Sequence, residues 1–103
     1  MSCFALMLLV TLLVPSVAQA QSFNCRTAEL PDEILICQTP HLKMLDERMA
    51  DLYFELRNNL RGEERNALET SQRRWLRSRI ACGRDRECIE GEYERRIAQL
   101  RNF

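Results

Sequence analysis

The stretch SQRRWLRSRIACGRDREC, residues 71–88, decides how this chain of 103 residues folds. Its six arginines, one tryptophan and two cysteines fit three alternatives: a basic helix for nucleic acid, half of a metal site, or a disulfide-linked corner. On a helix with 100° per residue, Trp75 and Cys82 lie within about 40° of Leu68 and share one apolar face. Three arginines lie on the opposite side and are expected to face water: Arg73, Arg74 and Arg77.

A fourth arginine, Arg79, falls on the apolar face itself, close in angle to Trp75. Arg96 likewise falls on the apolar face of the last helix that the sequence predicts. A buried guanidinium without a partner is very costly, so both arginines need polar or charged neighbours inside the domain. We predict that Arg79 and Arg96 pair with carboxylates drawn from Asp46 and Glu33.

The first 20 residues have the composition of a signal peptide. Residues 4–14 are almost entirely apolar, and Ala18 and Ala20 occupy the small-residue positions of a cleavage site. The apolar run is shorter than the ~20 residues that a membrane-spanning helix needs. No cysteine follows Ala20, so no stable membrane anchor is expected. We predict cleavage near Ala20 and a periplasmic or secreted domain comprising residues 21–103.

Four cysteines remain after that cleavage: Cys25, Cys37, Cys82 and Cys88. An even number in a short exported chain indicates two disulfides, for which the sequence alone allows three pairings. We favour the local pairing, Cys25–Cys37 and Cys82–Cys88. Each bond would stabilise the fold by roughly 2–3 kcal/mol through loop entropy. The spacings do not fit the close cysteine pairs of zinc sites, so we expect neither a metal nor any other cofactor.

Helix signals dominate the rest of the chain. Pro31 and Pro40 suit first helical positions, with Thr39 as a candidate N-cap. After Pro40 the apolar residues recur every three or four positions and form one stripe: Leu42, Leu45, Met49, Leu52, Tyr53, Leu56 and Leu60. Further helices are predicted at about 63–81 and 85–101, and Gly91 suggests close packing within the last one.

These patterns predict an all-α fold, a small disulfide-stapled helical bundle. A short N-terminal helix at about 31–38 would precede three longer antiparallel helices. No sustained alternation of apolar and polar residues indicates a strand.

The chain carries no net charge, but its charges are unevenly spread. Residues 21–64 hold five basic and nine acidic side chains, and residues 65–103 hold ten basic and six acidic ones. Oppositely charged helices packing together would explain this distribution, and an acidic half that meets a cationic partner is the alternative. A chain without net charge and with outward arginines on a solvated face is not expected to bind nucleic acid.

No sequence motif points to catalysis. A nucleophile elbow, a phosphate-binding glycine loop and an H-E-x-x-H helix are all missing, and a domain this small leaves little room for a cleft between two carboxylates. We therefore predict no enzyme and no small-molecule substrate, and expect a protein partner.

An ordered set of residues resembles the LprI-type lysozyme-inhibitor family. The set consists of FNC at 23–25, EILIC at 33–37, Leu45-Asp46, Tyr53, Gln72-x-x-Trp75-Leu76, Arg79-x-x-Cys82, Cys88 and Tyr93-x-x-Arg96-Ile97-x-x-Leu100. Two positions depart from the family pattern. Leu30 stands where the family has Thr or Ser before the first proline, and Ile80 stands where it has Asp.

The resemblance implies an exported helical domain that inhibits or binds lysozyme-type cell-wall hydrolases by occlusion. Such hydrolases are often cationic, so the acidic half is the expected binding side. The candidate partner-binding residues, taken as exposed, are Asp32, Glu47, Asp51 and Glu55. The alternative is a periplasmic protein-interaction or structural module without lysozyme activity.

Overall fold

A short 3-10 turn and four α-helices make up residues 22–103, the part of the chain that the computed structural model describes. The elements are η1 (Cys25–Thr27), α1 (Pro31–Gln38), α2 (Pro40–Asn59), α3 (Gly62–Ala81) and α4 (Arg86–Arg101). The predicted signal peptide and its cleavage site lie outside the described residues. Within residues 22–103 no helix is both long and apolar enough to cross a membrane. The all-α prediction is confirmed, and each predicted helix is present.

The helices begin and end where local chemistry favours it. Pro31 and Pro40 occupy first-turn positions, where a missing N–H costs nothing. Thr39 holds the N-cap position of α2 as predicted, but its side chain makes no capping hydrogen bond. The carboxylate of Asp85 does cap α4, accepting from the Cys88 N–H at 3.1 Å. Gly83, with φ at +57°, terminates α3 in a backbone conformation that glycine adopts without strain.

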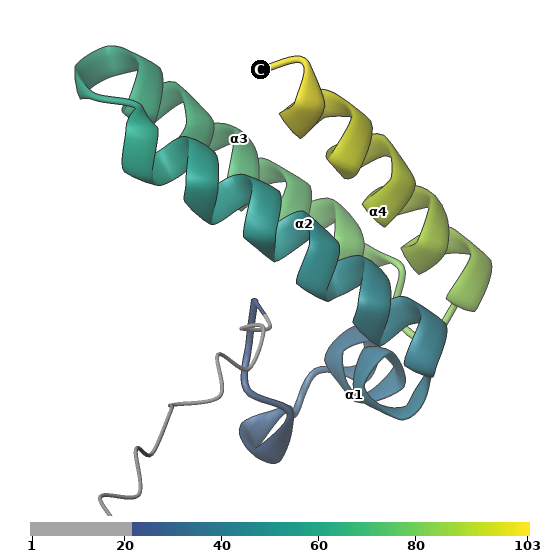
Figure 1. Ribbon diagram of the computed structural model, residues 1–103. Helices are drawn as coiled ribbons and strands as arrows, with labels where there is room; N and C mark the ends of the chain where they lie inside the picture. The colour runs from purple at the N-terminus through teal and green to yellow at the C-terminus, as the bar shows by residue number, and fades with distance from the viewer. Residues whose placement is uncertain (1–21) are drawn as a thin grey trace, which may run out of the picture.

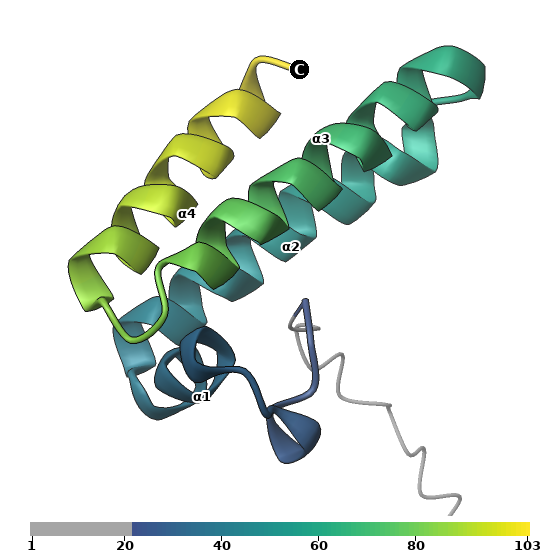
Figure 2. The ribbon, with the colours of Figure 1, turned by 180° about the vertical axis from the view of Figure 1, so that it is seen from behind.

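The three long helices form an up-down-up bundle (Figure 1). The α2 and α3 helices form a hairpin, and α4 returns along it antiparallel to α3, making its most extensive contact with α2. Figure 2 shows the same bundle from behind, with α1 beside the start of α2 and near the α3–α4 turn. The predicted short helix followed by three antiparallel helices is therefore confirmed.

The core lies where α2, α3 and α4 meet, and α1 contributes Ile36 to it. Its buried apolar side chains are Ile36, Leu42, Leu45, Met49, Leu68, Trp75, Ile89, Tyr93, Ile97 and Leu100. The later positions of the predicted α2 stripe, such as Leu56 and Leu60, are only half-buried. The α4 helix has 16 residues against 20 in α2, and it ends short of the α2–α3 loop, so the far end of the hairpin lacks its third helix (Figure 1).

Both predicted disulfides are confirmed. Cys25–Cys37 ties the η1 turn to the end of α1, with 5.8 Å between the Cα atoms. Cys82–Cys88 joins the end of α3 to the first turn of α4, with 5.6 Å between the Cα atoms. The two bonds thus hold the same end of the bundle, where α1 and the α3–α4 turn lie close together (Figure 2).

The expectation of close packing at Gly91 is wrong. A Cβ atom placed there would meet only side-chain nitrogens of Arg95, the nearest at 3.4 Å, which is ordinary contact with a flexible group.

Gly91→Ala should therefore raise the free energy of unfolding by up to about 1 kcal/mol, because alanine has the higher helix propensity and meets no obstacle. Gly83→Ala is the matched control and should destabilise the chain, since its φ is positive. Urea denaturation of both variants measures the difference. A less stable Gly91→Ala variant would show that this position does pack closely.

Candidate functional site

A cluster of charged and polar groups lies inside the bundle, centred on Arg79. The Arg79 side chain is 2% exposed, and its Nε donates to Asp32 Oδ2 at 2.8 Å. Its Nη1 donates to the Tyr93 hydroxyl at 3.4 Å, and that hydroxyl donates to Asp46 Oδ1 at 2.9 Å. We call Asp32, Asp46, Arg79 and Tyr93 the buried charge cluster. It links α1, α2, α3 and α4 through side chains that are almost inaccessible to water.

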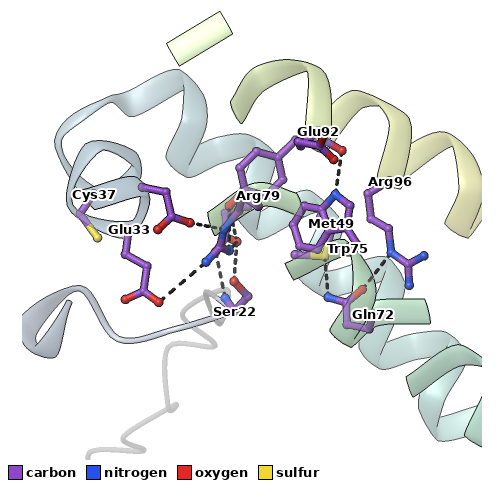
Figure 3. Close-up of polar contacts among 12 residues, drawn as sticks. Ser22, Glu33, Cys37, Met49, Gln72, Trp75, Arg79, Glu92 and Arg96 are labelled. Carbon is purple, nitrogen blue, oxygen red and sulfur yellow. Dashed lines mark hydrogen bonds and ion pairs between the residues drawn. The ribbon is translucent and has the colours of Figure 1, made fainter. Parts of the chain in front are cut away.

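The start of the described chain joins this cluster. The Ser22 N–H donates to Asp46 Oδ2 at 2.9 Å, and the Ser22 hydroxyl donates to the other carboxylate oxygen (Figure 3). The rings of Phe23 and Trp75 flank the Arg79 guanidinium, with their centroids 5.1 and 5.6 Å from Cζ. Cation–π contacts at these distances add to the ion pairs. The segment before η1 is therefore held by the same groups that join the helices.

Protonation states in the cluster follow from burial and from these contacts. Burial lowers the pKa of Arg79, but the Coulombic effect of Tyr93 and the hydrogen bond and charges of the two aspartates outweigh it, so the net shift is upward. Burial and the neighbouring Asp46 raise the pKa of Tyr93 well above its usual range, against the opposing effect of Arg79. Tyr93 is therefore a neutral donor to Asp46 at physiological pH, and Arg79 is a cation.

The structure corrects the predicted role of Asp32. This residue was expected to be exposed and to bind a partner, but its side chain is 0% exposed and it is the closest carboxylate to Arg79. The predicted partners Glu33 and Asp46 are also nearby, at 3.8 and 3.9 Å from guanidinium nitrogens. The sequence contained a signal for this placement. Asp32 lies four residues before the buried Ile36, on the same face of α1.

Among the described residues no carboxylate pairs with Arg96, so the prediction that it has a carboxylate partner is wrong. Its Nε donates to Gln72 Oε1 at 2.9 Å, its Nη2 to Ser71 Oγ at 3.0 Å, and its Nη1 to Gln99 Oε1 at 3.3 Å. Gln72 in turn lies between Arg96 and the sulfur of Met49 (Figure 3). Neutral oxygens thus satisfy donors of the guanidinium without neutralising its charge. Ser71 and Gln72 share the apolar side of α3 with Trp75, and polar residues at these positions are the sequence signal for neutral partners of Arg96.

The outward side of α2 is the surface that remains for a partner. Asp51 and Glu55 are exposed, and Glu47 is half-buried. Two large apolar side chains lie on the same side, Met44 at 42% and Phe54 at 41% exposed. We call these five residues the α2 outer face. Glu47 and Asp51 also line a groove of about 330 Å³, together with the exposed Arg48 of the same helix and Arg101 of α4. The exposed Met and Phe side chains suit protein binding, because interfaces are enriched in Met and aromatic residues.

Asp32→Ala should lower the free energy of unfolding by about 3–5 kcal/mol, because it leaves a buried guanidinium without its closest carboxylate. Glu33→Ala is the matched control on the next residue. It should cost about 1 kcal/mol or less, since the Glu33 side chain is partly exposed and more distant. Chemical denaturation gives both values, and equal losses would contradict Asp32 as the main partner of Arg79.

The buried charge cluster also predicts a loss of stability in alkali. The unfolded chain releases the Tyr93 proton near pH 10, whereas the folded chain, with its raised Tyr93 pKa, retains it. The folded state then binds more protons, so the free energy of unfolding should fall by up to about 1.4 kcal/mol per pH unit above about pH 10. Denaturation at several alkaline pH values measures this slope. Tyr93→Phe should lack this contribution, so identical slopes in the two proteins would rule it out.

Comparison with known proteins identifies relatives that share most of this chain. The family model described as "Lysozyme inhibitor LprI" matches residues 24–101. Proteins named "Lipoprotein LprI" from Mycobacterium bovis and Mycobacterium tuberculosis are 31% identical to it over 83 residues. The match covers 78% of this chain but 41% of each relative, so the chain spans less than half the length of these proteins.

No solved structure matches the chain. The family match nevertheless extends from the residue before η1 to the last residue of α4, and it includes both disulfides and the whole buried charge cluster. The chain belongs to the LprI lysozyme-inhibitor family.

Proposed function

We propose that this chain is an exported inhibitor of lysozyme-type cell-wall hydrolases, and that it acts by covering the hydrolase with the α2 outer face. The family to which it belongs is named for lysozyme inhibition, which supports an inhibitory role at the level of the family. Such an inhibitor needs no chemistry of its own, because it has only to block access to the substrate cleft of its partner.

The observation that carries the proposal is the combination of charge and apolar area on one helix. Glu47, Asp51 and Glu55 recur every four residues, so they form one line along α2. The exposed Met44 and Phe54 lie on the same side of the helix and offer apolar area to a partner. Acids of this kind would attract a cationic hydrolase and raise its rate of association.

The interior of the bundle supports this use of α2. Asp46, next to Glu47 in the sequence, points inward and accepts hydrogen bonds from Tyr93 and Ser22. The helix also makes its most extensive contact with α4. Because the core fixes the helix, its outer face loses little conformational freedom when it binds, and such preorganisation favours affinity.

Export is supported by the disulfides. Both bonds close within the chain, and all four cysteines of residues 21–103 take part in them. Disulfides of this kind persist in oxidising compartments such as the bacterial periplasm or the extracellular space. Together with the predicted signal peptide at 1–20, the disulfides support export to a compartment in which cell-wall hydrolases act.

Titration of purified residues 21–103 against a panel of cationic lysozymes tests the proposal. We expect dose-dependent inhibition of cell-wall hydrolysis that weakens as salt rises, since exposed charges are screened. The triple variant Glu47→Gln, Asp51→Asn, Glu55→Gln should lose about tenfold or more in inhibition, because each exposed pair is worth up to about 1 kcal/mol.

A second triple variant provides the matched control. Glu63→Gln, Glu87→Gln, Glu94→Gln removes the same charge from exposed positions on α3 and α4. Equal losses in the two triple variants would show that only net charge matters. They would contradict the proposal that the α2 outer face is the binding surface. An absence of both inhibition and complex formation with every lysozyme would refute the inhibitor proposal and favour an interaction module without lysozyme activity.

A further inference from the structure

A second surface, distinct from the α2 outer face, lies on the other side of the bundle. A groove of about 500 Å³ runs between α3 and α4, and we call it the α3–α4 groove. Its lining includes three arginines, Arg74, Arg95 and Arg96, together with the exposed Phe103 at its end. No α2 residue contributes to it.

Arg96 is the unusual member of this set. It is 2% exposed, and it uses three of its five N–H donors on the neutral oxygens of Gln72, Ser71 and Gln99. Among the described residues no carboxylate lies within ion-pair distance of it. Arg79 in the same core has two buried carboxylates around it. A buried guanidinium whose charge is not neutralised is costly, and an anion from outside would remove much of that cost.

The rim of the groove adds to this positive charge. Arg74 is exposed, and the side chain of Arg95 is 63% exposed. One acid faces them, since Glu92 Oε1 accepts from Arg95 Nη2 at 2.6 Å. Three guanidinium groups against one side-chain carboxylate leave the side chains of the lining with a net positive charge. Guanidinium groups bind carboxylates and phosphates through paired, charge-assisted hydrogen bonds.

We propose that the α3–α4 groove binds a small organic anion. Its carboxylate or phosphate group would meet the unneutralised Arg96 at the inner wall, with Arg74 and Arg95 at the rim. Its apolar part would pack against Phe103, which is 49% exposed at the end of the groove. This site does not depend on lysozyme inhibition, because the two surfaces share no residue.

The chain provides its own reporter for this site. Trp75 is its only tryptophan, it lines the groove, and its indole N–H donates to the Glu92 carbonyl at 2.9 Å (Figure 3). Nuclear magnetic resonance on purified residues 21–103 can therefore follow the Trp75 indole N–H and the Arg96 Nε–H during titration. Three probes of similar shape separate the head groups: benzoate, phenyl phosphate and the neutral benzyl alcohol, all at constant ionic strength.

We expect saturable shifts of both signals with benzoate or phenyl phosphate, and none with benzyl alcohol. The stronger of the two anions identifies the preferred head group. The absence of a saturable shift with either anion, or equal shifts with benzyl alcohol, would overturn the proposal.

Variants at exposed positions test the site without disturbing the core. Arg74→Gln, Arg95→Gln should weaken anion binding about three- to tenfold, since exposed, solvent-screened charges each make a modest contribution. The matched control Arg77→Gln, Arg84→Gln removes the same charge from exposed positions outside the groove and should change affinity less than about twofold. Equal effects of the two pairs, or no effect of the first pair, would place the anion elsewhere and overturn the proposal.

Discussion

The pairing of Arg79 with Asp32 is the constraint on which this small domain depends. A cation inside the bundle is tolerable only if carboxylates surround it, and those carboxylates come from α1 and α2 while the cation comes from α3. Tyr93 connects α4 to these charges, and Ser22 connects the segment before η1 to them, each through a hydrogen bond to Asp46. The groups around this one buried charge therefore link all four helices and the segment before η1.

The second buried arginine, Arg96, has a different environment in the same core. Arg79 is surrounded by anions, whereas Arg96 contacts only amide and hydroxyl oxygens. Burial lowers the pKa of Arg96, with a partly compensating effect of Tyr53, which agrees with a guanidinium that lacks an anionic neighbour. The difference matters because Arg79 lies in the centre of the fold and Arg96 at the wall of a groove. The first arginine organises the structure, and the second leaves charge available to a ligand.

Local features of this chain could be predicted from the sequence, and long-range partners could not. The helix limits follow from Pro31, Pro40 and Gly83, and the disulfides from cysteines close in sequence, because these signals act within a few residues. The burial of Asp32 depends on how α1 packs against α3, 47 residues away. Periodicity identified Arg79 and Arg96 as buried, but it could not tell which would receive a carboxylate.

The ordered set of residues that resembles the family and the residues proposed to bind a partner form separate sets. Trp75, Arg79, Tyr93 and Arg96 belong to the ordered motif, and all four are buried. The acids of the α2 outer face do not belong to it. Family membership therefore accounts for the scaffold, which many different surfaces could share. Under the proposed function, the choice of hydrolase would be set by side chains such as Asp51 and Glu55, which can change without disturbing the buried charge cluster.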